Sequence, residues 1–155
     1  MTILNTVFPS LELISAAFSG VLTGALLTEA RVLVPYWRKM SSHEFLQLHH
    51  TMAPSLFQFF APITIAGTML PTVAAVCSLL TQSATAHWWA VSASLGLALL
   101  AIYFAYFKHA NKKFETGNIA EADLPKELSK WAFWHNLRTT ISVFGFLAAL
   151  IATQY

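Results

Sequence analysis

The stretch Lys130–Tyr155, KWAFWHNLRTTISVFGFLAALIATQY, begins with two indoles, an imidazole, an amide and a guanidinium and continues as a long apolar run. About 20 apolar residues in a helix cross a bilayer, so this run is long enough to do so. At 3.6 residues per turn, Trp131, His135 and Arg138 fall on one face of that helix. The segment therefore predicts a membrane-spanning helix whose first turns carry a polar and aromatic face.

Three further apolar segments of comparable length precede it, at Phe8–Ala30, Ser55–Leu80 and Trp88–Phe107. Backbone groups in lipid must bond within their own segment, so all four segments are expected to be helices. Hydrophobic residues make up 56% of the chain and charged residues 10%, whereas soluble domains carry about 25% charged residues. We expect residues 1–155 to form a single all-α domain in contact with the lipid bilayer.

The basic residues predict the orientation of the four helices. Three of them surround the first connection and the other six surround the third: Arg31, Arg38 and Lys39, then Lys108, Lys112, Lys113, Lys126, Lys130 and Arg138. The second connection, Thr81–His87, and both termini have none. The positive-inside rule then places the first and third connections in the cytoplasm and both termini outside. This predicts an up-down-up-down four-helix bundle, a multi-pass protein of the inner membrane if the source is bacterial.

The connections carry signals for the ends of helices. Ser41 with Glu44 three residues later is typical of a capping box. We expect a short helix from there to Pro54, where a bend or junction leads into the second span. Asp123 followed by Pro125 predicts the start of the fourth helix, with its first two turns outside the membrane.

Small residues recur at helical spacing in the first and third spans, at Ala16, Gly20, Gly24, Ala93 and Gly96. They allow neighbouring helices to approach closely, or they simply face lipid. Helices this rich in small and aromatic residues leave open whether the chain pairs with copies of itself. The formal net charge of +2 is too small to argue for binding of nucleic acid.

Polar groups of several helices are predicted to reach the same depth. Counting back about 20 residues from the end of the fourth span puts Arg138 about 6 Å inside the cytoplasmic boundary. Glu29, His50, His109 and His135 lie near the corresponding ends of their own helices. Ion pairing of Glu29 with Arg138 or Arg31 would offset part of the cost of burying each charge. A charged group next to a lipid-spanning segment points to a functional site. Anchoring of Trp and Arg at the headgroups is the alternative.

The histidines allow two kinds of site. His49 and His50 point about 100° apart on a helix, so one of them at most faces a site. We favour His50, which follows His43 by seven residues and precedes Pro54 by four. Imidazoles and a carboxylate suit iron, copper or zinc, and the candidate metal ligands are His50, His109, His135 and Glu29. A haem held by His50 and His135 is the related alternative.

The pattern Trp131-x-x-Trp134-His135-Asn136-x-Arg138-Thr139 resembles the small four-helix membrane proteins of the anthrone oxygenase-like group. In bacteria these are mostly known as a domain of unknown function. The segments Leu46–His50 and Asn111–Lys113 extend the resemblance over most of the chain. The resemblance implies oxidation of anthrones to anthraquinones by molecular oxygen, often without an identified cofactor. In the family pattern an Asn usually follows the second Trp, whereas His135 holds that place here.

The resemblance implies a membrane-embedded oxidoreductase acting on a lipophilic aromatic, anthrone- or quinol-like small molecule. Trp131, Trp134, Asn136 and Glu29 would bind the substrate. His135 or His50 would remove its acidic proton, and Arg138 would stabilise the resulting anion. Two alternatives stay open: a membrane protein that binds haem or a transition metal through the same histidines, and a non-catalytic membrane subunit. Whether the chain is an enzyme at all, and whether it needs a cofactor, is left open by the sequence.

Overall fold

The fold is a bundle of four helical rods, seen in a computed structural model that describes residues 2–154 and, from Phe8 onward, their side chains. The first rod is α1 (Thr2–Thr28), the π-helical turn η1 (Glu29–Leu33) and α2 (Val34–Trp37). The second rod is α3 (Ser42–Leu80). The third is α4 (Ala86–Ile102), the π-helical turn η2 (Tyr103–Phe107) and α5 (Lys108–Thr116), and the fourth is α6 (Leu124–Ala152).

All four rods are long and apolar enough to cross a membrane. Within the described residues the qualifying stretches are Phe8–Trp37, Ser42–Leu80, Ala86–Thr116 and Leu124–Ala152. This confirms the predicted all-α bundle and indicates a multi-pass membrane protein. The first three rods extend beyond the predicted spans inside them, and α6 begins before Lys130 and ends at Ala152. The helices thus continue beyond the roughly 20 residues that the hydrocarbon requires.

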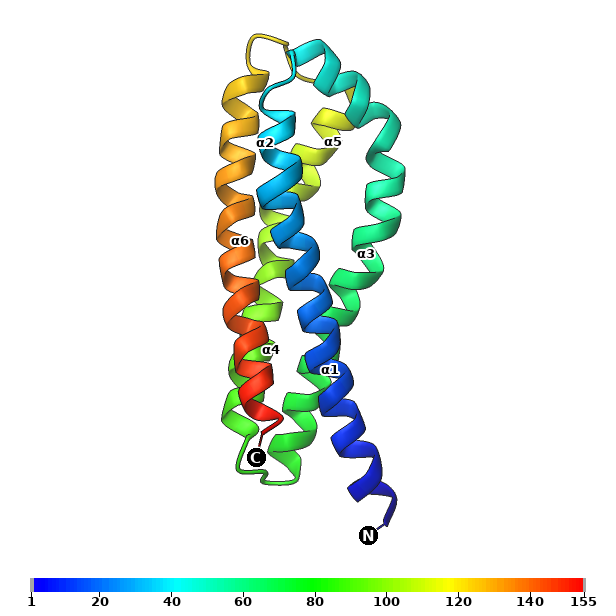
Figure 1. The fold of residues 1–155 in the computed structure, drawn as a ribbon, viewed down its shortest axis with the longest axis vertical. Helices are drawn as coiled ribbons and strands as arrows, with labels where there is room; N and C mark the ends of the chain where they lie inside the picture. The colour runs from blue at the N-terminus through cyan, green and yellow to red at the C-terminus, as the bar shows by residue number, and fades with distance from the viewer. Residues whose placement is uncertain (1, 155) are drawn as a thin grey trace.

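The rods lie side by side, with α1 and α4 each packed between α3 and α6. Figure 1 shows the beginning of α1 and the end of α6 at one end of the bundle, with the connection 81–85. The connections 38–41 and 117–123 lie at the opposite end. The ends of the helices that carry the basic residues are therefore gathered at one end of the molecule.

Toward the end of the bundle that holds the connection 81–85, small buried residues pack around a large one. Ala74 and Ala149 are fully buried beside Trp89, whose indole N–H donates to Glu12 at 2.8 Å. The predicted small-residue faces are present only in part. Ala16, Ala93 and Gly96 are buried, whereas a Cβ on Gly24 would meet nothing within 4 Å.

Helix α3 differs from the prediction for its segment. Ser41 and Glu44 form the expected capping box. The helix then runs unbroken through Pro54, Pro62 and Pro71, so the expected short helix and the second span are one helix with no junction at Pro54. A proline removes one backbone hydrogen bond and bends a helix without necessarily ending it. Residues 50–66 include no buried side chain, and α3 bows away from the other rods over this part (Figure 1).

Candidate functional site

A buried ion pair joins the first rod to the fourth. Glu29 is the first residue of η1, and its Oε2 accepts a hydrogen bond of 3.1 Å from Nη2 of Arg138 on α6. The Glu29 side chain is 6% exposed and that of Arg138 is 15% exposed. The ion pair that the sequence suggested between these two residues is therefore present, and Arg31 is exposed on the same turn.

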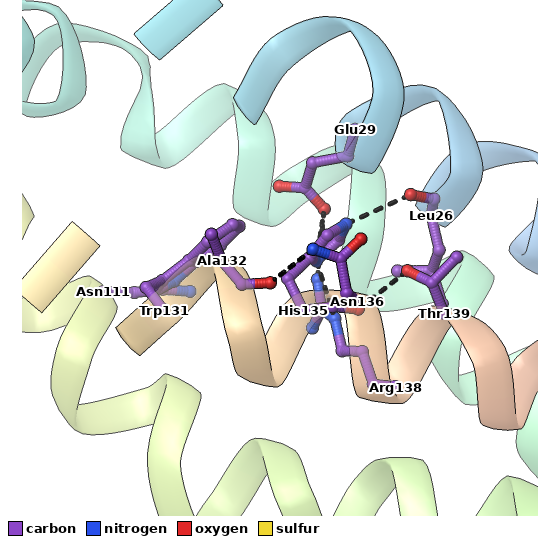
Figure 2. Close-up of polar contacts among 9 residues, drawn as sticks. All are labelled: Leu26, Glu29, Asn111, Trp131, Ala132, His135, Asn136, Arg138 and Thr139. Atoms are coloured by element: carbon purple, nitrogen blue, oxygen red, sulfur yellow. Dashed lines mark hydrogen bonds and ion pairs between the residues drawn. The ribbon is translucent and has the colours of Figure 1, made fainter. Parts of the chain in front are cut away.

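His135 is fully buried between the same two rods (Figure 2). Its Nδ1 accepts from Nε of Arg138 at 3.1 Å, and its Nε2 lies 3.1 Å from the carbonyl oxygen of Leu26. A carbonyl can only accept, so this pattern assigns the ring proton to Nε2 and makes the imidazole neutral. The distance between Glu29 Oε2 and His135 Nδ1 is 3.6 Å. Glu29, His135 and Arg138 thus form one connected cluster, which we call the polar triad.

Both nitrogens of His135 are engaged in this arrangement. A general base needs a free lone pair within reach of the proton it removes. The lone pair on Nδ1 already accepts from Arg138. In this geometry His135 therefore fixes the direction of the guanidinium and offers no nitrogen to a ligand.

Aromatic rings enclose the polar triad on the side of α5 and η2. Trp131 stacks on His135 with ring centroids 4.9 Å apart and planes at 8°. The guanidinium carbon of Arg138 lies 4.2 Å from the ring centroid of Phe107. Trp131 is fixed in turn by a 2.8 Å hydrogen bond from its indole N–H to Asn111. A guanidinium over a ring face is attracted by the ring's quadrupole, so Phe107 stabilises the position of Arg138.

Two π-helical turns lie next to the polar triad. Glu29 begins η1, and Phe107 ends η2. A π-helical turn holds one residue more than an α-helical turn, and single turns of this kind occur frequently at functional sites. No residue pattern in the sequence marked either turn. They are the strongest feature of the site that sequence reasoning missed.

Two other predicted site residues lie outside the triad. Trp134 is half-buried and stacks on Tyr106, with ring centroids 5.7 Å apart. Asn136 is exposed, and its amide donates to the Ala132 carbonyl of its own helix at 2.9 Å. Figure 2 includes Asn136 beside the cluster, but no described contact joins it to Glu29 or Arg138.

The two adjacent histidines differ in burial, and His50, the one favoured from the sequence, is the exposed one. His50 is exposed, and its Nδ1 lies 2.9 Å from the carbonyl oxygen of Glu115. His49 is buried instead, with its ring centroid 4.5 Å from Phe45 and 5.1 Å from Trp37. The helix does not break before Pro54, so the phase set by buried Phe45 carries His49 inward four residues later.

The candidate metal ligands do not assemble. His50 and His109 are exposed on α3 and α5, whereas Glu29 and His135 are buried together. Among residues 2–154 no group of three or more His, Cys, Asp or Glu side chains is placed to hold a metal ion. His50 also shares no described contact with His135, so the pairing proposed for haem is not formed between them.

Two cavities are found elsewhere on the molecule. A groove of about 470 Å³ lies along α5, and a void of about 10 Å³ lies between the helices near Ser19, Ser92 and Ser142. Neither is lined by a member of the polar triad. Within the triad, the Arg138 side chain is the most exposed, at 15%. A ligand that reaches this cluster would therefore meet Arg138 first.

Comparison with known proteins adds no assignment to this geometry: no family model matches the chain, and neither a curated protein nor a solved structure matches it.

Proposed function

We propose that the protein is a multi-pass membrane oxidoreductase of the anthrone oxygenase-like kind, acting on a lipophilic aromatic substrate at the polar triad. The observation that carries the proposal is the ion pair between Glu29 and Arg138, buried beside the neutral ring of His135. Ionisable residues inside a membrane bundle are costly and mark functional sites by default. The positive-inside rule puts this end of the bundle in the cytoplasm and both termini outside.

Arg138 is the anion-binding group of this proposal. Its Nε and Nη2 are held by His135 and Glu29, and its side chain is the least buried of the three. Hydrogen bonds from a guanidinium to an oxyanion are charge-assisted and stronger than those between neutral groups. An anthrone- or quinol-type substrate entering from the lipid would place its oxygen on Arg138. Trp131 and Phe107 would supply the apolar walls.

Glu29 is the better candidate for the proton acceptor than either histidine first considered. His135 has no free nitrogen, and His50 is exposed and bonded to the Glu115 carbonyl. When a substrate oxygen takes the place of Glu29 on Arg138, the carboxylate loses its cation in an apolar site. Its oxygens are then free to accept a hydrogen bond or a proton. The substrate proton would pass to Glu29, and His135 would keep Arg138 in position.

The chemistry balances with molecular oxygen as the oxidant. Loss of a proton from the methylene carbon of an anthrone gives a carbanion whose charge is shared with the carbonyl oxygen bound to Arg138. The carbanion gives its electrons to oxygen and a C–O bond forms, which leaves a peroxide anion. This anion takes back the proton held by Glu29 and becomes a hydroperoxide. Loss of water from the hydroperoxide leaves the second carbonyl. One substrate and one oxygen molecule therefore give one quinone and one water.

One observation favours a second candidate, a non-catalytic membrane subunit. The triad is closed on itself, because Arg138 bonds to both Glu29 and His135 and the latter bonds to Leu26. A structural role, in which the network holds the first and fourth rods in register, would be enough to explain such an arrangement.

Purified protein in lipid nanodiscs separates the two candidates. The assay follows oxygen uptake and quinone absorbance with an anthrone and with a hydroquinone as substrates. We expect turnover by the wild type, at least a hundredfold loss in Glu29→Gln, since proton transfer by a placed side chain contributes about 10²–10⁴-fold, and little change in the control Arg31→Gln. Full turnover by Glu29→Gln would show that Glu29 is not the base. If the wild type neither turned over nor bound these substrates, the non-catalytic subunit would be the supported candidate.

A further inference from the structure

The groove along α5 is lined mainly by cationic and polar side chains. Its volume is about 470 Å³, and it is bordered by Lys108, His109, Lys112, Lys113, Thr116 and Asn118. This groove is separate from the polar triad and shares no lining residue with it. What it binds is therefore independent of the function proposed above.

Helical spacing explains why these side chains gather on one side. Ala110 and Phe114, four residues apart, are buried and hold α5 against the bundle. The lysines and Thr116 point away from that face at spacings of three and four residues. Gly117 ends the helix in the left-handed conformation with φ of 64°, and the Asn118 N–H then bonds back to the Lys113 carbonyl at 3.0 Å. This return of the chain brings Asn118 to the groove.

The positive charge of the groove is only partly neutralised. Lys112 pairs with Glu115 at 3.2 Å, and this pair is exposed. Within residues 2–154, neither Lys108 nor Lys113 has a described ion pair. The groove therefore presents more cationic groups than its own carboxylate can match, and it suits an anion.

The position of the groove along the membrane normal indicates the kind of anion. The third rod spans Ala86–Thr116, and about 20 of its residues are enough to cross the hydrocarbon. Counted from Ala86, the hydrocarbon ends close to Phe107, and the nine residues of α5 rise a further 13 Å or so. The headgroup layer occupies about the first 5–7 Å of that rise. Lys108 and Lys112 therefore lie at the level of the lipid phosphates.

We infer that this groove binds the headgroup phosphate of an anionic phospholipid in the adjacent leaflet. Lys108, Lys112 and Lys113 supply the charge, and the Thr116 hydroxyl and Asn118 amide lie within the same groove as further polar groups. Zwitterionic lipid also has a phosphate, but its own ammonium group offsets the attraction of the lysines. Each basic group near a membrane surface contributes about 1 kcal/mol with anionic lipid. Specific retention of anionic lipid is the measurable result.

Native mass spectrometry of the full chain, released from mixed phosphatidylcholine and phosphatidylglycerol, tests the inference. We expect the wild type to retain phosphatidylglycerol preferentially. The variant with Lys108→Gln, Lys112→Gln and Lys113→Gln should lose this preference by about fivefold for each lysine removed. The matched control carries Lys39→Gln, Lys126→Gln and Lys130→Gln, which removes the same charge from exposed sites at the same end of the bundle. The control should retain the wild-type preference.

Three results would overturn the inference. Unchanged retention in the α5 variant would show that the groove does not hold the lipid. An equal loss in the control would mean that overall surface charge, and not this groove, selects the lipid. Inorganic phosphate that displaces phosphatidylglycerol and binds the lipid-free protein with similar affinity would make the groove a site for a free anion. Size-exclusion chromatography and far-ultraviolet circular dichroism check that both variants are folded.

Discussion

Replacing Arg138 by Gln tests whether the buried ion pair determines the stability of the bundle. At 3.1 Å the Coulomb attraction is about 5 kcal/mol for an effective dielectric constant near 20. Desolvation of the two groups offsets part of that attraction, so the pair contributes less than this to the free energy of unfolding. Removing one partner is different, because the remaining charge stays buried alone. Losses of about 3–5 kcal/mol are typical of that situation.

The two single variants should differ in a defined order. Arg138→Gln leaves the Glu29 carboxylate, whose side chain is 6% exposed, without a cation. Glu29→Gln leaves Arg138, which is more exposed and still lies over Phe107. We therefore expect Arg138→Gln to lower the free energy of unfolding by more than Glu29→Gln. The double variant has no unpaired charge and should be less destabilised than the sum of the two single variants.

Reversible unfolding in mixed detergent and dodecyl sulfate micelles, followed by circular dichroism, measures these free energies. The control is Arg31→Gln, which removes the same charge from an exposed position on η1 and should change the free energy by no more than about 0.5 kcal/mol. The reasoning is refuted if Arg138→Gln behaves like this control. It is also refuted if the losses of the two single variants simply add in the double variant.

Three further predictions use the same unfolding assay. Gly67→Ala should lower the free energy of unfolding by about 1–3 kcal/mol, because the new Cβ would lie 2.9 Å from Cδ2 of Leu22. The control Gly24→Ala meets open space and should be neutral or stabilising. Equal effects of the two variants would contradict the packing. Gly117→Ala forces an alanine to φ of 64° and should cost about 1–2 kcal/mol; a stabilised variant would contradict the assigned conformation. Trp131→Phe keeps a ring beside His135 but loses the bond to Asn111, a loss of about 1 kcal/mol; an unchanged midpoint would show that this bond contributes nothing.

Much of the bundle was predictable, because the physical requirement is simple. A lipid-crossing helix needs an apolar length and internal backbone bonds, and both are visible in the composition of each segment. The capping box at Ser41 and Glu44 was also readable, since its two partners lie three residues apart in sequence. Counting depth along separate helices was enough to suggest the pairing of Glu29 with Arg138.

Other features depend on contacts that a single segment cannot reveal. The choice of His50 over His49 rested on its spacing from His43 and Pro54, whereas burial follows the helix phase set by Phe45, which turns His49 inward. The engagement of both nitrogens of His135 depends on a carbonyl of another rod, at Leu26. Phe107 reaches Arg138 through η2, and no residue pattern in the sequence marks that π-helical turn.

The extra residue held in η1 gives the first rod a tolerance for changes in chain length. Deleting one residue there would let the turn relax to ordinary α-helical winding, and the same face of Val34–Trp37 would still pack against the bundle. The same deletion would swing Glu29 away from its present direction. The winding of this one turn therefore sets both the direction of the carboxylate and the face that the following helix turns to the bundle.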